Sequence, residues 1–408
     1  MYVYRWPPPE AVEIEIDQVR QKSDDWHGYL TVRYRSPGVS PHLFEGNHNL
    51  SALQGRTALA KHLESRVHDV DWPAFLELAC VMTIRAERQG EPFERVGSLA
   101  LESQRPFWLI EPVVRVGLPT VLFGDGGHGK STTALMLAST LLSGMEIAGF
   151  RPLWTAPVLY LDWETDREEI DDSLKGLRAG HGIDIPDIIY RREIWPLAQT
   201  YRQAQRVIAQ EQVQLVVIDS LGAACGGEPE SAEVALRFFG ALRSLNCGAI
   251  VLHHENRKEG YYGSPYVRNS ARLMFRLRKH QLPEQNVMHV GLYWEKANKG
   301  EMQHPRGLKV EYGEQFIRYE SEEIPADARE LMAAMPQPEQ IRRCLRSSRR
   351  AMTATEIADE TGIPIASVKS RLSGMKGEVV RLDIRPVDGV RYAPKFALKS
   401  AYGEQEAG

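Results

Sequence analysis

The chain has 408 residues, of which 43% are hydrophobic and 25% are charged, and its formal net charge is -4. This length and balance predict a globular protein of two or three domains, each with its own core. No stretch approaches the roughly 18 uninterrupted apolar residues of a membrane helix, and the N-terminus lacks a signal-peptide pattern, so we expect a cytoplasmic protein without a membrane partner. The four cysteines form no C-x-x-C pair, which argues against a disulfide framework or a zinc site.

Charge is distributed unevenly along the chain. Residues 1–104 carry 11 Lys and Arg against 15 Asp and Glu, whereas residues 336–400 carry 13 against 7. The basic part of the chain is therefore its C-terminal part, which is the better candidate for a polyanionic partner.

The first 104 residues show strand patterns followed by helical periodicity. Alternation of apolar and polar residues at 12–16 and at 30–34 predicts the two strands of a hairpin. We expect a small α+β domain over residues 1–104 and find no motif in it that carries chemistry. Its four scattered histidines do not match the spacing of a metal site, and they are His42, His48, His62 and His68.

From about residue 107 to residue 319, near-continuous apolar segments alternate with helical segments. Apolar runs of this kind are typical of strands that are buried on both faces. We therefore expect an α/β domain over residues 105–325, with a mainly parallel sheet flanked by helices. The expected strands lie at residues 120–123, 158–161, 215–218, 249–252 and 287–294.

A glycine-rich motif follows the first of these strands. Residues 124–131 read GDGGHGKS and match G-x-x-x-x-G-K-[ST] at every fixed position. In such a loop backbone N–H groups surround phosphate oxygens, the lysine places a cation at the outer phosphates, and the serine hydroxyl can hold magnesium. The motif predicts a site for ATP and Mg²⁺ formed by Gly124, Asp125, Gly126, Gly127, His128, Gly129, Lys130, Ser131 and Thr132.

Acidic residues end two of the expected strands. Asp219 follows residues 215–218, and we expect it to reach the magnesium ion beside Ser131. Because Ser220 comes next instead of a glutamate, the base that orients the attacking water must come from another strand. Glu164 follows residues 158–161 at a suitable distance and is the candidate base, with Asp162 as the alternative.

Two histidines, His253 and His254, end the strand at residues 249–252. A histidine at a strand end can form a hydrogen bond with the terminal phosphate and report its presence. A purely structural pair is the alternative.

Together the motifs GDGGHGKS, VLYLDWE, LVVIDSL and VLHHENRK resemble, in this order, the RecA-like ATPases, and among them the hexameric replicative helicases of the RepA type. The resemblance covers about residues 105–320. It implies that Glu164 activates water, that His254 senses the γ-phosphate, and that a basic residue after a late strand reaches the nucleotide of a neighbouring subunit. Lys296 and Lys299 occupy that late position, where the family more often has an arginine.

Two segments of this domain suit single-stranded DNA. Residues 222–230 are rich in small residues and resemble the loop that lines the central channel of such rings. Residues 256–264 combine cations with aromatic rings, a pairing that places cations on phosphates and rings on bases. The expected DNA-binding residues there are Arg257, Lys258, Tyr261 and Tyr262. A surface loop without a ligand is the alternative.

In the basic C-terminal part, helical patterns at 339–348, 353–360 and 366–375 precede a hairpin pattern at 379–392. With these patterns, residues 336–400 resemble the winged-helix family. The cations expected on or near the third helix are Lys369, Arg371 and Lys376, which suit DNA phosphates. Contact with protein during ring assembly is the alternative use of such a domain.

These patterns favour a ring-forming ATPase, expected to be a hexamer, that couples ATP hydrolysis to translocation on single-stranded DNA as a DNA helicase of a plasmid, phage or integrated element. A ring is expected because the site, as read from the sequence, lacks a finger residue supplied by the same chain. The alternatives are a non-unwinding recombination mediator or switch ATPase, and an ATP-sensing winged-helix transcriptional regulator. The role of residues 1–100 and the polarity of translocation do not follow from the sequence.

Overall fold

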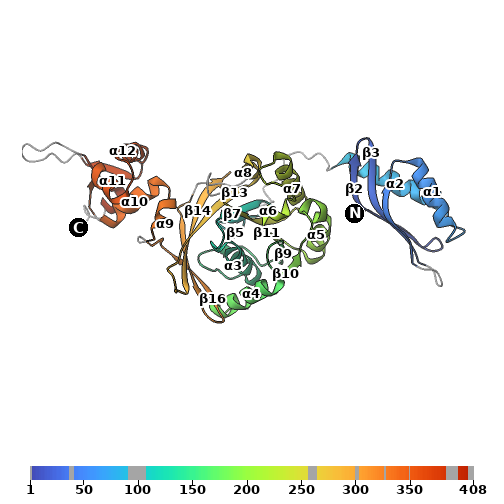
Figure 1. Cartoon of the computed structure of the whole chain (residues 1–408), viewed down its shortest axis with the longest axis horizontal. Helices are drawn as coiled ribbons and strands as arrows, with labels where there is room; N and C mark the ends of the chain where they lie inside the picture. Colours follow the sequence, from blue (N-terminus) through green and yellow to red (C-terminus); the bar gives the residue numbers. More distant parts are fainter. Residues whose placement is uncertain are drawn as a thin grey trace, which may run out of the picture. The chain divides into compact units, whose positions relative to one another are not determined.

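The computed structural model describes residues 2–35, 41–90, 107–255, 264–298, 303–325, 328–348, 350–382 and 394–402. The chain divides into two compact units, Met1–Arg105 and Pro106–Gly408 (Figure 1). No helix within these described ranges is both long enough and apolar enough to cross a membrane.

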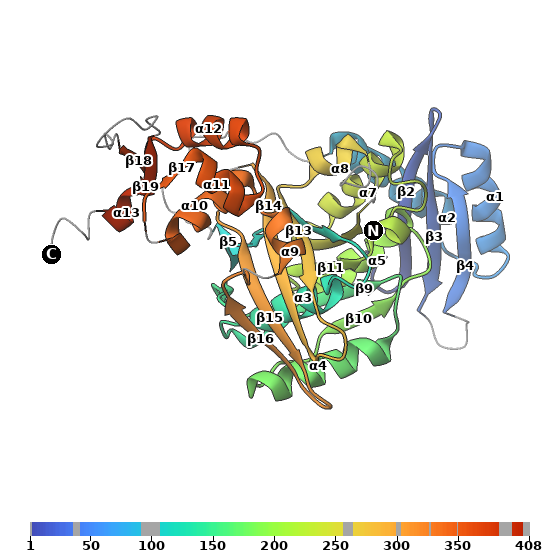
Figure 2. The same ribbon diagram turned by 60° about the vertical axis from the view of Figure 1, so that its left-hand side comes forward.

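The N-terminal unit is an antiparallel sheet with helices on one face (Figure 2). Alternation along the second strand places Ile14 and Ile16 in the core beneath the helices, together with Trp72. The opposite face is polar, and Glu13 forms ion pairs there with Arg5, with Arg33 of the next strand and with Arg35 just after that strand. The small α+β domain expected for this part is confirmed. Its elements are β1 (Tyr2–Trp6), β2 (Val12–Lys22), β3 (Asp25–Tyr34), β4 (His42–Asn49), α1 (Leu53–Glu64) and α2 (Trp72–Gln89).

The described part of the second unit contains a sheet of nine strands in the order β10-β9-β11-β12-β7-β13-β14-β15-β16. Its parallel strands are β10 (Ile189–Arg192), β9 (Val158–Asp162), β11 (Leu215–Asp219), β12 (Gly248–His254), β7 (Pro119–Gly124) and β13 (Leu273–His280). An antiparallel extension follows, formed by β14 (Val287–Ala297), β15 (Arg306–Tyr312) and β16 (Ile317–Glu322). The mainly parallel α/β fold is therefore confirmed, although the expected strand at 287–294 belongs to the antiparallel part.

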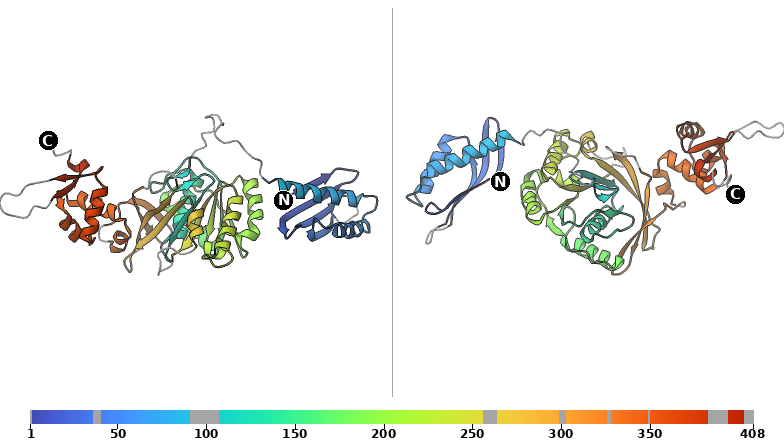
Figure 3. Two further views of the ribbon diagram at one scale, coloured as in Figure 1. Left: turned by 90° about the horizontal axis from the view of Figure 1, so that it is seen from above. Right: turned by 180° about the vertical axis from the view of Figure 1, so that it is seen from behind.

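Helices cover both faces of this sheet (Figure 3). Alternate strand residues point to opposite faces, so Leu122 of β7 joins one core while its neighbours Val121 and Phe123 join the other. The first core includes α3 (Lys130–Ser143) and α4 (Arg167–His181). The second includes α5 (Leu197–Glu211), α6 (Leu221–Ala224) and α7 (Ala232–Ser244). Smaller elements are β5 (Trp108–Glu111), β6 (Val114–Arg115), β8 (Arg151–Pro152) and α8 (Pro265–Ser270).

The antiparallel extension is held closely against α3 and α4. Gly180 of α4 approaches β16 so closely that a Cβ atom there would lie 2.1 Å from the carbonyl oxygen of Ile317. Arg318 donates a hydrogen bond of 2.9 Å to the carbonyl oxygen of Gly180. In α3 the hydroxyl of Thr133 lies 3.4 Å from that of Tyr319. The extension therefore fixes the helix that follows the glycine-rich loop.

The C-terminal part of the second unit has its own helical core. α9 (Arg329–Ala334) packs against β14, where Tyr293 donates a hydrogen bond of 2.6 Å to the carbonyl oxygen of Leu331. Helices occupy the stretches at which the sequence predicts them, and the tip of the expected hairpin, residues 383–392, lies outside the described residues. The elements are α10 (Gln337–Ser348), β17 (Met352–Thr353), α11 (Ala354–Thr361), α12 (Ile365–Gly374), β18 (Val379–Leu382), β19 (Lys395–Leu398) and α13 (Lys399–Tyr402).

Candidate functional site

The glycine-rich loop connects β7 to α3, between a buried central strand and the N-terminus of a helix. Gly127 and Gly129 have φ angles of +70° and +75°, which other residues rarely adopt. A Cβ atom at Gly124 would lie 2.6 Å from the carbonyl oxygen of Leu277, whereas one at Gly126 would meet no other described atom within 4 Å. The loop can therefore curl over the N-terminus of α3, whose N–H groups form an anion site.

Lys130 begins α3 and extends back over the loop. Its ammonium donates hydrogen bonds of 3.2 and 2.9 Å to the carbonyl oxygens of Gly124 and Asp125. Burial lowers the pKa of Lys130, and the nearby carboxylates of Glu164 and Asp219 oppose this effect. The loop thus has a nearly buried cation with acidic groups close by.

The two residues expected to bind magnesium lie together. Asp219 at the end of β11 is 2% exposed, and the hydroxyl of Tyr160 donates a hydrogen bond of 2.6 Å to its carboxylate. Burial raises the pKa of Asp219, and the nearby hydroxyls of Tyr160 and Ser131 oppose the rise. Carboxylate and hydroxyl oxygens are ligands that suit Mg²⁺. The donor set therefore fits this ion, with Asp219 and Ser131 as the residues that would hold it.

Glu164 lies beside this pair, in the turn after β9. Its Oε1 atom accepts a hydrogen bond of 3.1 Å from Nε2 of His254 and another from the hydroxyl of Ser220. The hydrogen bond with His254 is the main cause that lowers the pKa of Glu164. Since its side chain is 37% exposed, this ionised carboxylate is accessible to water. The structure thus brings together residues from the ends of β9, β11 and β12.

Asp162, the alternative base, has a different position. It is fully buried, and its Oδ1 atom accepts hydrogen bonds of 2.9 Å from the backbone N–H groups of both Glu164 and Thr165. Its Oδ2 atom accepts hydrogen bonds from the hydroxyls of Thr165 and Tyr190, at 2.7 and 2.9 Å. Asp162 therefore stabilises the turn that presents Glu164.

The other residues that the sequence predicts for this site make different contacts. His253 is fully buried, in contrast to His254. The Nδ1 atom of His128 lies 3.1 Å from the carbonyl oxygen of Leu277, and the Thr132 side chain lies near the hydroxyl of Tyr312 in β15. These contacts attach the loop and the first turn of α3 to β13 and to the antiparallel extension.

The lysine expected to act on a neighbouring subunit is engaged within its own chain. The ammonium of Lys296 donates hydrogen bonds of 2.5 and 2.8 Å to the carbonyl oxygens of Arg268 and Ala271, at the C-terminal end of α8. Burial lowers the pKa of Lys296. The remaining expected residues of this domain lie outside the described residues, namely Arg257, Lys258, Tyr261, Tyr262 and Lys299.

Two cations of β13 near the loop were not expected from the sequence. An Nη1 atom of Arg278 lies 3.7 Å from Asp125 and 2.6 Å from Glu255, which is the residue directly after β12. A Cβ atom at Gly127 would lie 3.5 Å from the ammonium of Lys279. Two cations of the same chain therefore lie near the loop, and Arg278 is already paired with acidic residues there. The basic residues that alternate with apolar ones in residues 273–280 were the available signal.

Cations of the C-terminal part line a groove of about 810 Å³ between α12 and the strands β18 and β19. Two of the expected residues, Lys369 and Lys376, line it together with Arg381 and Lys399. Arg371 is placed differently, since its Nε atom lies 3.3 Å from the side-chain oxygen of Gln337 in α10. The structure thus separates Arg371 from the other two expected residues.

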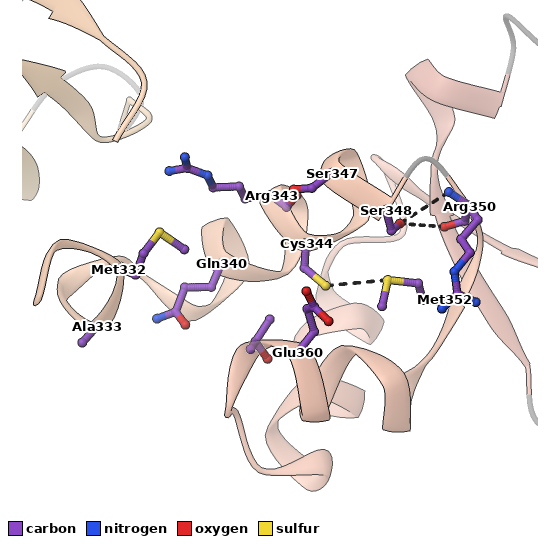
Figure 4. Close-up of a pocket in the computed structure, with 11 residues that line it drawn as sticks. Met332, Ala333, Gln340, Arg343, Cys344, Ser347, Ser348, Arg350, Met352 and Glu360 are labelled. Atoms are coloured by element: carbon purple, nitrogen blue, oxygen red, sulfur yellow. Dashed lines mark hydrogen bonds between the residues drawn. The ribbon is translucent and has the colours of Figure 1, made fainter. Parts of the chain in front are cut away.

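A second cavity of this part, about 570 Å³ in volume, lies beside α10 and α11 (Figure 4). The Sγ atom of Cys344 lies 3.7 Å from the sulfur of Met352 at this cavity. Burial raises the pKa of Cys344 to about 11, so this cysteine is a thiol and not a reactive thiolate at neutral pH. No cluster of three or more His, Cys, Asp or Glu suited to a metal ion occurs in the described portion of the chain.

Comparison with known proteins shows similarity over part of the chain. Residues 85–260 match a family model described as "AAA domain", and this range includes the glycine-rich loop, Glu164, Asp219 and His254. Among solved structures, a KaiC-like protein of the hyperthermophilic archaeon Pyrococcus horikoshii OT3 is 19% identical, with a TM-score of 0.37, and the match covers 52% of this chain and 93% of that chain. No curated protein matches the chain. The match and the sheet with its glycine-rich loop support a P-loop ATPase domain.

Proposed function

We propose that this chain hydrolyses ATP with Mg²⁺ at the glycine-rich loop and uses the reaction to move along single-stranded DNA as a ring-forming helicase. The observation that carries the hydrolytic part is the meeting of Glu164, Asp219 and Lys130 at one edge of the sheet. The part concerning DNA rests on the basic segments and on the family resemblance.

Each group has a distinct chemical task in this proposal. Backbone N–H groups of the loop and the Lys130 ammonium bind the phosphates. Magnesium, which Ser131 and Asp219 would hold, supplies positive charge against the phosphate oxygens. Glu164 orients a water molecule and takes its proton, because it is ionised and exposed. His254 connects this base to the end of β12.

The position of His254 supports a link between hydrolysis and DNA. Its neighbour Glu255 is paired with Arg278, and the segment with expected DNA-binding residues starts at residue 256. A change at Glu164 has a short route to that segment, through one hydrogen bond and two residues of chain.

The C-terminal part supplies a second surface for nucleic acid. Its helices α10–α12 and its strands support the winged-helix resemblance, and the groove carries Lys369, Lys376, Arg381 and Lys399. Clustered cations of this kind neutralise phosphates without reading sequence. The proposal includes a hexameric ring because the helicases that the sequence resembles are hexamers.

The test measures ATP turnover with and without single-stranded DNA, together with the opening of a forked duplex. We expect DNA to raise turnover several-fold and the fork to open. Stimulated turnover without opening would favour a recombination mediator or switch ATPase. A sequence-specific duplex footprint would favour a transcriptional regulator.

The matched variants for the hydrolytic part are Lys130→Ala and Lys175→Ala. Lys175 is exposed on α4, where it pairs with Asp171. We expect Lys130→Ala to abolish turnover, because the cation at the outer phosphates is lost, and Lys175→Ala to leave turnover unchanged. Normal turnover in Lys130→Ala would contradict the site.

A further inference from the structure

Tyr160 has an unusual setting in the middle of β9. Its side chain is fully buried, and its hydroxyl donates a hydrogen bond of 2.6 Å to Oδ2 of Asp219. The Ser131 side chain lies near the same hydroxyl. A buried hydroxyl is costly unless it is hydrogen-bonded, and this one meets both residues that would hold magnesium.

We propose that Tyr160 is a positioning residue for the divalent cation, because its hydroxyl orients the Asp219 carboxylate beside Ser131. This inference rests on the proposed magnesium-dependent binding of ATP. Tyr160 acts through Asp219, as outer-shell partners of metal ligands generally do, and loss of such a partner typically weakens metal affinity about 10- to 100-fold.

The register of the sheet explains why this tyrosine can reach the acid. Tyr160 is paired with Val217 on the neighbouring parallel strand β11, and Asp219 lies two residues further along that strand. Residues two apart on a strand share a face, so the side chains of Val217 and Asp219 point to the same side of the sheet. The phenol ring therefore extends along that face and places its hydroxyl at the strand end.

The chain contains a matched control on the next strand. Tyr190 of β10 donates a hydrogen bond of 2.9 Å to Oδ2 of Asp162, and its ring is stacked with that of Tyr160, with 6.4 Å between the centroids. Asp162 also accepts hydrogen bonds from Glu164 and Thr165. Removal of the Tyr190 hydroxyl therefore takes away the same kind of bond from a carboxylate that stabilises a turn.

The experiment compares the wild-type chain with Tyr160→Phe and Tyr190→Phe. Binding of a fluorescent, non-hydrolysable ATP analogue is measured in excess Mg²⁺ and in EDTA. The dissociation constant in EDTA divided by the dissociation constant in Mg²⁺ gives the effect of the cation. We expect Tyr160→Phe to lower this ratio about 10-fold or more while the dissociation constant in EDTA stays as in the wild type. Tyr190→Phe should keep the wild-type ratio.

A direct titration with Mg²⁺ at fixed analogue concentration provides the second readout. The Mg²⁺ concentration for half-maximal binding should rise about 10- to 100-fold in Tyr160→Phe alone. A merely structural role of the ring would leave this concentration unchanged, since phenylalanine keeps the ring.

A wild-type ratio in Tyr160→Phe, or an equal loss in Tyr190→Phe, would overturn the inference and leave the proposed function intact. A wild-type chain whose analogue binding ignores Mg²⁺ would instead remove the proposed function together with the inference. Thermal unfolding reports whether each variant folds. If Tyr160→Phe does not fold, the hydroxyl is needed for folding itself, and this outcome also overturns the inference.

Discussion

The last residues of β9 and β11 have similar surroundings but different roles. Their final residues, Asp162 and Asp219, are paired in register, both are buried, and each accepts a hydrogen bond from a tyrosine. After Asp162 the chain turns back, so that N–H groups of the turn reach the carboxylate. After Asp219 the chain enters α6, and the carboxylate contacts Ser131. The residues that follow a strand thus decide whether its terminal acid stabilises a turn or serves the glycine-rich loop.

The largest expected effect concerns the residue that the β9 turn presents. Glu164→Gln should lower ATP hydrolysis about 1000-fold, since the amide cannot take a proton from water. Binding of the ATP analogue should remain, because the loop and Lys130 are unchanged. Single-turnover phosphate release and analogue binding measure the two quantities. Normal hydrolysis in Glu164→Gln would show that the base lies elsewhere.

Substitution of the two aspartates should change the free energy of unfolding by different amounts. Asp162→Asn should reduce the free energy of unfolding by about 2–4 kcal/mol, because a carboxylate that accepts several buried hydrogen bonds is lost. Asp219→Asn should cost less than about 1 kcal/mol, since burial already raises the pKa of Asp219 and thus disfavours its charged form. Urea unfolding of both variants checks this order, and the reverse order would break the comparison.

Glu356 extends the comparison to a carboxylate at a helix start. In α11 the Thr353 side chain accepts the N–H of Glu356 at 3.2 Å, and Glu356 accepts the N–H of Thr353 at 2.7 Å. This backbone hydrogen bond is the main cause that lowers the pKa of Glu356 from 4.5 to about 2. A carboxyl group with a lowered folded-state pKa stabilises the protein above its unfolded pKa, and this stability is lost as the pH falls through the folded value.

The wild type should therefore lose more stability than Glu356→Gln between pH 4.5 and about 2. Thr353→Ala should cost about 1 kcal/mol at pH 7, through loss of the helix cap. Denaturant unfolding of the full chain across this pH range measures both effects. Parallel pH curves for the wild type and Glu356→Gln would contradict the assigned role of this carboxylate.

The smallest effect is expected at Lys296. Its ammonium contacts carbonyl oxygens at the C-terminal end of α8, and a cation at such an end contributes about 0.5 kcal/mol. Lys296→Ala should therefore lower the unfolding midpoint slightly and leave hydrolysis near the wild-type rate. A loss of hydrolysis of about 1000-fold at normal stability would instead support Lys296 as a cation that reaches a neighbouring nucleotide.

The glycine-rich loop and the acids at strand ends were predictable because each depends on local sequence. Gly127 and Gly129 are needed for the backbone angles of the loop itself, and Asp219 directly follows a buried apolar run. β13 was not expected, because its arginines are compensated across the sheet. Arg276 lies 2.9 Å from Glu295, and Arg278 lies 2.6 Å from Glu255. Such pairs are invisible in a hydropathy pattern.

The direction of a strand and its tertiary contacts also cannot be inferred from a one-dimensional residue pattern. An apolar run such as that of β14 fits a parallel or an antiparallel neighbour equally well, so its antiparallel pairing with β13 could not be inferred. The contact of Lys296 with α8 joins residues 25 positions apart. The role of Asp162 depends on a turn whose N–H directions cannot be read from a residue pattern.

The close fit of the antiparallel extension limits how the protein can be shortened. A fragment that stops at residue 260, where the family match ends, would lack β13, one of the two strands that pair with the central strand β7. It would also uncover the face of α4 around Gly180 and strip Tyr312 and Tyr319 from the first turn of α3. The smallest autonomous ATPase fragment must therefore run through β16, well past the boundary that sequence similarity suggests.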